Sequence, residues 1–230
     1  DARSAARRAC TRPEPTRIMT PGRFITLEGI EGAGKSTVAG ALVDTLREQG
    51  LTVRQTREPG GTPLAERLRQ VVLERGDESI SAEAETLLMF AARSIHLENL
   101  VRPALERGEW VLCDRFTDAT RAYQGAGRGV DRALIEQLAA AVHRGLEPDL
   151  TVILDLPVPM GLERARARRQ AKSEAVVDRF ESETLQFFER VRAEYLAIAA
   201  RSPTRCRIID ASADPKTVTA HALSVLRPFL

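Results

Sequence analysis

The sequence predicts an α/β protein in which helices cover both faces of a parallel sheet. Two observations carry this prediction. Short apolar segments alternate with helical segments along most of the chain, and a glycine-rich loop joins the first apolar segment to the first helix. Strands that are separated by helices pair in parallel, because the chain must cross over the sheet between them. The expected strands are 23–28, 51–56, 110–114, 151–156 and 206–210.

The expected strands are compact and apolar, and several expected helices have clear end signals. The segments RFITLE (23–28), WVLCD (110–114) and TVILDL (151–156) are typical of buried strands. Gly50 ends the first helix, so that a strand can follow it. Pro103 predicts an interruption or a kink in a long helical segment. The expected helices follow the loop 29–37 to about 49 and then cover 63–74, 82–106, 131–144, 159–169, 183–200 and a last segment from 215.

The composition is that of an ordinary globular domain. The chain has 230 residues, of which 43% are hydrophobic and 29% are charged. Lysine and arginine number 34 against 32 aspartates and glutamates, a balance that argues against a general nucleic-acid binder. A run of about 18 apolar residues is absent, so no membrane-spanning helix is expected. The cysteines Cys10, Cys113 and Cys206 suit neither a disulfide framework nor a metal site, which favours a reducing, cytoplasmic setting.

The first 22 residues differ from the rest of the chain. They contain five arginines, two acidic residues and three prolines, with no apolar periodicity. An arginine-rich, acid-poor segment is typical of a transit peptide, but Pro13, Pro15 and Pro21 interrupt any amphipathic helix. We therefore expect a disordered extension at 1–22 and a single domain over 23–230.

A phosphate-binding loop follows the first expected strand. Residues 29–36 (GIEGAGKS) match the pattern G-x-x-x-x-G-K-[ST], with an apolar strand before them and a helix after them. Glycines allow successive backbone N–H groups to turn toward phosphate oxygens, and the helix directs its positive end to the same anion. Lys35 can then reach the transferring phosphates, and Ser36 can bind magnesium. This predicts that a P-loop NTPase fold binds a nucleoside triphosphate here.

The remaining sequence favours a kinase over a switch or a motor. It contains neither the N-K-x-D segment of a GTPase nor the L-S-G-G-Q segment of a cassette ATPase. Arg57 follows the second expected strand, and Asp114 and Arg115 end the third. Ligands of open parallel sheets bind at these carboxyl ends. The two arginines are therefore candidates to hold phosphate, and Asp114 is a candidate magnesium ligand, with Asp155 as a weaker alternative. A kinase for another nucleoside monophosphate, a nucleotide-dependent switch and an inactive interaction protein remain open.

Five segments together resemble one family of kinases. They are LEGIEGAGKST, TREPGGT, CDRFTDATRAYQGAGRG, PDLTVILDL and DRFE, and they occur in this order from about Arg23 to the C-terminus. In these segments the chain is similar to the bacterial thymidylate kinases. The resemblance implies a five-stranded parallel sheet and transfer of the γ-phosphoryl group of ATP to thymidine monophosphate (dTMP), with Mg²⁺, for dTTP synthesis. It also implies a homodimer.

The resemblance assigns roles to individual residues. Lys35 would act on the donor phosphates, and Arg57 and Arg115 would clamp the acceptor phosphate. Ser36 and Asp114 would place Mg²⁺. The implied ATP-binding residues are Gly29, Ile30, Glu31, Gly32, Ala33, Gly34, Lys35, Ser36 and Thr37. The implied acceptor-binding residues are Glu31, Arg57, Met89, Phe90, Arg93, Arg115, Thr120, Tyr123, Gln124 and Glu181, with Gln124 at the thymine edge.

The helical segment 84–97 predicts one wall of the nucleoside pocket. Each residue of a helix advances by about 100°. One face then carries an apolar stripe, which we expect to face the core: Ala84, Leu87, Leu88, Ala91 and Ile95. Arg93 falls opposite this stripe, between Met89 and Phe90. The resemblance implies that an aromatic ring stacks on thymine while Arg93 donates to a carbonyl group. The family usually places that ring where this chain has Met89, so we expect Phe90 to stack, with Met89 as the alternative.

A cluster of arginines follows the fourth expected strand and comprises Arg164, Arg166, Arg168 and Arg169. Arg164 and Arg168 share one helix face because they are four residues apart. The resemblance implies a lid at 164–180 that supplies a catalytic arginine when the phosphate loop lacks a basic residue. Gly32 stands at that loop position. Charge on the transferred phosphoryl group must then be balanced from elsewhere. We expect Arg168 to do this, with Arg164 second, beside Lys35 and Arg115.

Overall fold

The computed structural model describes residues 22–74, 78–172, 179–180 and 183–230. Glu181, the middle of the expected lid and residues 1–21 of the expected extension lie outside these ranges. The boundaries of the extension and of the lid therefore stay predictions.

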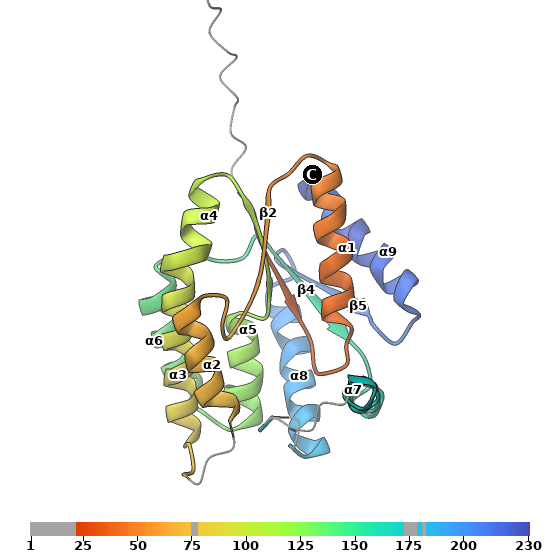
Figure 1. Ribbon diagram of the computed structural model, residues 1–230. Helices are drawn as coiled ribbons and strands as arrows, with labels where there is room; N and C mark the ends of the chain where they lie inside the picture. The colour runs from red at the N-terminus through yellow and green to blue at the C-terminus, as the bar shows by residue number, and fades with distance from the viewer. Residues whose placement is uncertain (1–21, 75–77, 173–178, 181–182) are drawn as a thin grey trace, which may run out of the picture.

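A five-stranded parallel sheet forms the centre of the protein (Figure 1). Its strands are β1 (Phe24–Glu28), β2 (Val53–Arg57), β3 (Trp110–Asp114), β4 (Leu150–Asp155) and β5 (Cys206–Asp210). The order across the sheet is β2-β3-β1-β4-β5, and every neighbouring pair runs parallel. The predicted α/β fold is confirmed, because each expected strand is present with its ends within two residues of the expected ones.

Helices connect the strands over both faces of the sheet (Figure 1). They are α1 (Lys35–Glu48), α2 (Pro63–Leu73), α3 (Ala82–His96), α4 (Arg102–Glu106), α5 (Thr117–Thr120), α6 (Arg132–His143), α7 (Val158–Lys172), α8 (Leu185–Arg201) and α9 (Pro215–Leu226). Two π-helical segments, η1 (Leu97–Val101) and η2 (Arg121–Gly127), and the 3₁₀ turn η3 (Arg227–Phe229) complete them. The wider turn of η1 interrupts the expected 82–106 helix just before Pro103, which has no backbone N–H to donate. The sequence pattern does not predict the helical segment of α5 and η2. In the described ranges, no helix has both the length and the apolar composition needed to cross a lipid bilayer.

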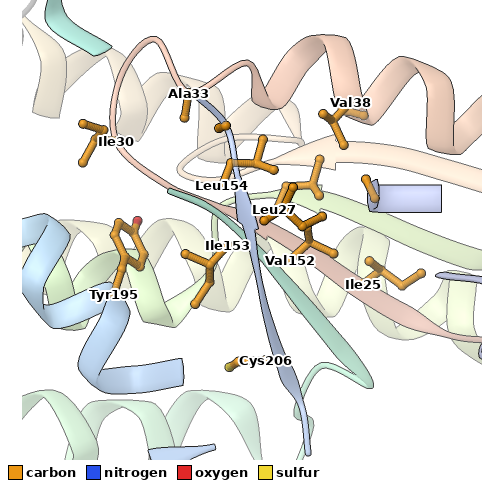
Figure 2. Packing of buried hydrophobic residues seen from close by; sticks show 14 of the residues in the cluster. Ile25, Leu27, Ile30, Ala33, Val38, Val152, Ile153, Leu154, Tyr195 and Cys206 are labelled. Atoms are coloured by element: carbon orange, nitrogen blue, oxygen red, sulfur yellow. The ribbon is translucent and has the colours of Figure 1, made fainter. Parts of the chain in front are cut away.

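Alternate side chains of β1 face opposite layers of the molecule. Phe24 packs with Leu97 and with other residues of η1, α4 and β3. Leu27 points the other way and belongs to a larger cluster that includes Val38 of α1. Figure 2 shows part of this cluster, with Val38 and Tyr195 of α8 on opposite sides of the strands. The sheet is thus covered on both faces, and the carboxyl edge, where β1, β2 and β3 end, is left for a site.

Helix α3 buries a different face from the one that its apolar stripe predicts. Leu87 is 52% exposed, Ala91 is exposed, and the other three members of the stripe are only half-buried. The expectation that this stripe faces the core is therefore wrong. The side chains that α3 buries are Glu85, Thr86, Met89, Phe90, Ala92, Arg93 and His96. This face can be buried because its charged groups form hydrogen bonds with residues of neighbouring elements.

Candidate active site

The phosphate loop joins the end of β1 to the start of α1. Gly34 has a φ of +88° and precedes the first residue of α1, so the helix begins directly after a left-handed turn. Gly32 has a φ of +74°, and a side chain there would collide with the Gly161 carbonyl group at the start of α7. Both positions therefore require glycine. The loop leaves the N-terminal N–H groups of α1 directed at the space above it, where an anion can bind.

Lys35 is buried at the base of this loop. Its Nζ donates to the carbonyl oxygens of Gly29 at 2.9 Å and Ile30 at 3.1 Å. Burial lowers its pKa from 10.5 to about 8, and the positive charge of Arg115 acts in the same direction. Negative phosphates beside Lys35 would oppose both effects, because they favour the charged ammonium group.

A polar cavity lies over the phosphate loop at the ends of β2 and β3. Its walls carry five arginines in addition to Lys35, which suits a polyanion. The lining residues are Glu31, Gly32, Ala33, Gly34, Lys35, Ser36, Thr37, Arg57, Arg69, Asp114, Arg115, Arg164 and Arg168. The structure thus brings together the loop, the strand-end arginines and the two lid candidates that the sequence predicts.

Asp114 and Ser36 offer oxygen atoms to a cation. Both line the phosphate cavity and also a smaller cavity beside β2. Among the described residues, Asp114 Oδ1 is buried and has no hydrogen-bond partner. A hard divalent cation, or a water bound to one, would satisfy such an oxygen. Asp155 does not offer this, because Arg192 binds both of its oxygens, at 2.7 and 2.9 Å.

Arg115 occupies the boundary between the phosphate cavity and a second cavity. Its φ of +70° is unusual for a side chain of this size and costs about 1–2 kcal/mol. Its guanidinium donates to Glu31 at 2.9 Å, to Tyr123 at 3.0 Å and to Tyr195 at 3.2 Å. It also lies over the Tyr123 ring, 4.7 Å from its centre. These contacts fix the guanidinium at the point where two ligands bound in the two cavities would meet.

Glu28 lies behind Arg115 and is completely buried. It accepts hydrogen bonds from the Phe116 N–H and the Tyr195 hydroxyl, each at 2.8 Å. Burial raises its pKa from 4.5 to about 7, with a smaller contribution from Asp118. The Tyr195 hydroxyl therefore links the buried Glu28 carboxylate to the Arg115 guanidinium.

The second cavity extends from Arg115 toward α3. Its walls include Glu31, Glu58, Pro59, Arg69, Leu73, Met89, Arg93, Arg115, Phe116, Ala119, Thr120, Tyr123, Gln124 and Phe180. This set contains all but two of the expected acceptor-binding residues within the described ranges. Arg57 lines the phosphate cavity instead, where Glu66 binds it at 2.9 Å. The remaining exception is Phe90.

Phe90 does not line the cavity. It packs with Val130, Ile135 and Ala139 on the side of α6. Met89, its neighbour on α3, does line the cavity. The structure therefore corrects the expected order of the two candidates, because successive residues of a helix point about 100° apart.

Arg93 is held rigidly at the inner end of this cavity. It is only 3% exposed, donates from Nε to Glu58 at 2.6 Å and donates from Nη2 to Thr120 at 3.1 Å. Its guanidinium carbon lies 4.8 Å from the centre of the Phe90 ring and 5.1 Å from that of Phe116. Within the described part of the chain, its Nη1 is buried without a hydrogen-bond partner. One strong donor is therefore available to a ligand.

The two lid candidates differ in their contacts. Arg164 donates to the backbone carbonyl oxygens of Ala211, at 2.7 Å, and Ser212, at 3.2 Å. Arg168 lies one helical turn further along α7 and lines the same phosphate cavity. The Arg164 guanidinium is therefore bound to the loop after β5, whereas the Arg168 guanidinium forms no hydrogen bond with any described residue.

Sequence reasoning misses several residues of the second cavity. Glu58, Pro59, Phe116 and Phe180 belong to the segments TREPGGT, CDRFT and DRFE, which the family resemblance already singles out. The resemblance assigns roles to other residues of these segments, such as Arg57, Arg115 and Glu181, but not to these four. Ala119 also lies in one of these segments, CDRFTDATRAYQGAGRG, whereas Arg69 and Leu73 carry no sequence signal, since their positions depend on how α2 packs.

The phosphate loop, its arginines and the adjoining polar cavity define a P-loop phosphotransferase with room for a second substrate beside the nucleotide. Comparison with known proteins identifies the family. The thymidylate kinase family profile matches residues 27–222, and the chain belongs to this family.

Individual relatives match over most of their length. The chain is 57% identical to a thymidylate kinase of Teredinibacter turnerae over 188 residues, which are 81% of this chain and 89% of the relative. It is 52% identical to one of Afipia carboxidovorans over 214 residues, 93% of this chain and 90% of the relative. The crystal structure of thymidylate kinase from Ehrlichia chaffeensis superimposes with a TM-score of 0.71 at 32% identity, covering 90% of this chain and 99% of that chain.

Proposed function

We propose that this protein transfers the γ-phosphoryl group of ATP to the phosphate of dTMP, forming dTDP and ADP. The observation that carries the proposal is the pairing of two adjoining cavities. One is built for a triphosphate, and the other ends at the buried Arg93 guanidinium, whose Nη1 has no hydrogen-bond partner among the described residues. Family membership supports thymine as the base that Arg93 binds.

The transfer requires alignment and charge balance rather than a nucleophilic side chain. An acceptor phosphate oxygen forms a bond to the γ-phosphorus as the bond to the bridging oxygen of ADP breaks. The loop N–H groups and Lys35 hold the donor phosphates, and Arg115 binds the acceptor phosphate from the boundary of the two cavities. Arg168, which lines the phosphate cavity, balances charge on the transferred group. Arg57 lines the phosphate cavity together with the loop and can therefore assist in binding the donor or the acceptor phosphate.

Mg²⁺ is the cation that we propose for Ser36 and Asp114. The unpartnered Asp114 oxygen and the Ser36 hydroxyl suit a hard cation with oxygen ligands. Magnesium neutralises the donor phosphates when it is bound. The chain's own residues then orient the acceptor and exclude water from it.

In the base pocket, we propose that Arg93 donates to the 4-carbonyl group of thymine and that Gln124 faces its N3–H group. Thr120 and Tyr123 form the wall beside the sugar. Met89 is the side chain of α3 that can lie against the base.

An assay of ADP release tests this function. With ATP and Mg²⁺, the enzyme should release ADP fastest with dTMP among dTMP, dUMP, UMP, CMP, AMP and GMP. Preference for another monophosphate would refute the base assignment and leave the phosphate machinery standing. No stimulation by any of them, with ATP still bound, would refute the kinase assignment. Arg93→Met is the matched variant: it should raise KM for dTMP and leave KM for ATP nearly unchanged.

We also propose that the protein is a homodimer. Leu64 and Val71 of α2 and Leu87 of α3 are about half exposed, and these two helices pack side by side (Figure 1). A second copy would cover this apolar face. Sedimentation should show a dimer for the wild-type chain and a monomer for Leu87→Arg, whereas a monomeric wild-type chain would refute the proposal. The cytoplasmic setting stays a proposal too, supported by the free, buried Cys113 and Cys206.

A further inference from the structure

Two polar side chains that line the second cavity, Arg93 and Gln124, each form a hydrogen bond with a buried carboxylate. Glu58 holds Arg93 at 2.6 Å, and Glu85 of α3 accepts a hydrogen bond from Gln124 Nε2, also at 2.6 Å. Glu85 is 0% exposed and Gln124 is 1% exposed. The geometry of Glu58 and Arg93 is part of the site already described, but the function proposed above gives no role to Glu85.

Glu85 determines which way the amide of Gln124 points. Arg128 donates to one carboxylate oxygen at 2.9 Å, and Arg179 donates to the other. A carboxylate between two guanidinium groups accepts hydrogen bonds and offers none. Only the NH₂ group of Gln124 can therefore face it. The carbonyl oxygen of Gln124 is left over, and no described group donates a hydrogen bond to it.

The cavity consequently presents one donor and one acceptor in fixed places. Arg93 Nη1 donates, and Gln124 Oε1 accepts. The 4-carbonyl and N3–H groups of thymine form the complementary acceptor and donor. Cytosine carries the opposite pattern at the same two positions, a 4-amino donor and an N3 acceptor. A reversed amide would present its NH₂ group to the ligand and so would match cytosine N3.

We propose that Glu85 is a specificity-determining residue, which locks the amide of Gln124 in the orientation that accepts a hydrogen bond from thymine and rejects the cytosine pattern. The proposal rests on the function proposed above. Glu85 does not touch the substrate and acts through Gln124, so its effect should appear in the choice between bases rather than in the chemical step.

The test compares two substrates that differ only at positions 3 and 4 of the base. These are dTMP and 5-methyl-dCMP, and kcat/KM is measured for both with saturating ATP. Glu85→Gln replaces the acceptor-only group by an amide that can donate to Gln124 Oε1, so the Gln124 amide can turn over. We expect the preference for dTMP to fall about tenfold or more, the effect of one mispaired hydrogen bond. Part of this change should be a rise in kcat/KM for 5-methyl-dCMP.

Arg128→Gln is the matched control, since Arg128 binds Glu85 and makes no side-chain bond to Gln124. It removes the ion pairs of Arg128 with Glu85 and with Glu183, so stability should fall while the preference for dTMP is retained. A merely structural role for Glu85 predicts that both variants lose activity on both substrates in proportion. An unchanged preference in Glu85→Gln, or an equal relaxation in Arg128→Gln, would overturn the proposal.

A second variant covers the case in which Glu85→Gln does not fold. Replacing Glu85, Arg128 and Arg179 together by Met removes the carboxylate with both of its guanidinium partners, a replacement that buried ion pairs often tolerate. The preference for dTMP should fall in this variant as well, and a retained preference would again overturn the inference. Failure of the wild-type enzyme to use dTMP would instead refute the proposed function itself.

Discussion

Replacing Glu28 by Gln tests whether a buried carboxylate beside the phosphate loop destabilises the fold above neutral pH. Burial raises the pKa of Glu28 from 4.5 to about 7, Asp118 adds to this, and Arg115 and the hydrogen bonds from Tyr195 and Phe116 oppose it. A tenfold change in the acid constant is worth about 1.4 kcal/mol, so the ionised form costs the folded state about 3 kcal/mol relative to the unfolded chain. The folded protein thus holds this proton more tightly than the unfolded chain does. Its stabilising contribution is complete below pH 4.5 and is lost as the pH rises through 7.

Glu28→Gln keeps the shape of the side chain and removes the titration. The free energy of unfolding of the variant relative to wild type should therefore increase by about 3 kcal/mol between pH 5 and pH 8. Urea denaturation followed by circular dichroism at several pH values measures this difference. A difference that stays constant with pH, or that grows toward acid pH, would refute the reasoning.

Three further predictions concern the phosphate loop, the lid and the turn after β2. Lys35→Met should lower kcat by about 100-fold or more while circular dichroism shows an intact fold, because the charge opposite the transferring group is lost; near-normal turnover would remove Lys35 from the chemistry. Arg168→Ala should lower kcat about tenfold or more with both KM values nearly unchanged, whereas Arg164→Ala should chiefly raise KM for ATP. Steady-state kinetics in both substrates separates the two, and the reverse pattern would exchange their roles. Gly61→Ala should lower the free energy of unfolding by about 2 kcal/mol or more, since a Cβ would lie 2.6 Å from the His96 ring at a φ of +86°. A loss below about 0.5 kcal/mol in denaturant titrations would mean that this turn relaxes.

The fold was predictable because its signals are local. Each strand is a compact apolar segment, and the loop GIEGAGKS fixes the first β-α connection by a pattern of glycines. The helical segment 117–127 was not predictable in this way. It is polar and contains Gly125 and Gly127, and it becomes helical where η2 packs against α8. Tertiary packing overrides local preference there.

The site was predictable at the strand ends and less so on α3. Lys35, Asp114 and Arg115 follow from the loop pattern and the sheet topology alone. On α3 the periodicity argument failed, because it treats apolar side chains as the buried ones. Here the buried face carries Glu85 and Arg93, whose partners Gln124 and Glu58 are distant in the sequence. No pattern within one helix can show those partners.

A contribution to stability does not explain why Glu58, Arg93 and Glu85 are buried at the second cavity. Replacing a buried ion pair by apolar side chains of similar volume is often neutral or stabilising. Apolar side chains could not supply a fixed direction of hydrogen bonding. Glu58 and Thr120 leave Arg93 one nitrogen to offer, and Glu85 leaves Gln124 one oxygen. Because both groups are oriented before the substrate arrives, binding need not order them. A base with the opposite pattern of donor and acceptor meets a site that does not readily rearrange. It follows that the first measurable consequence of weakening either carboxylate should be a loss of discrimination between bases.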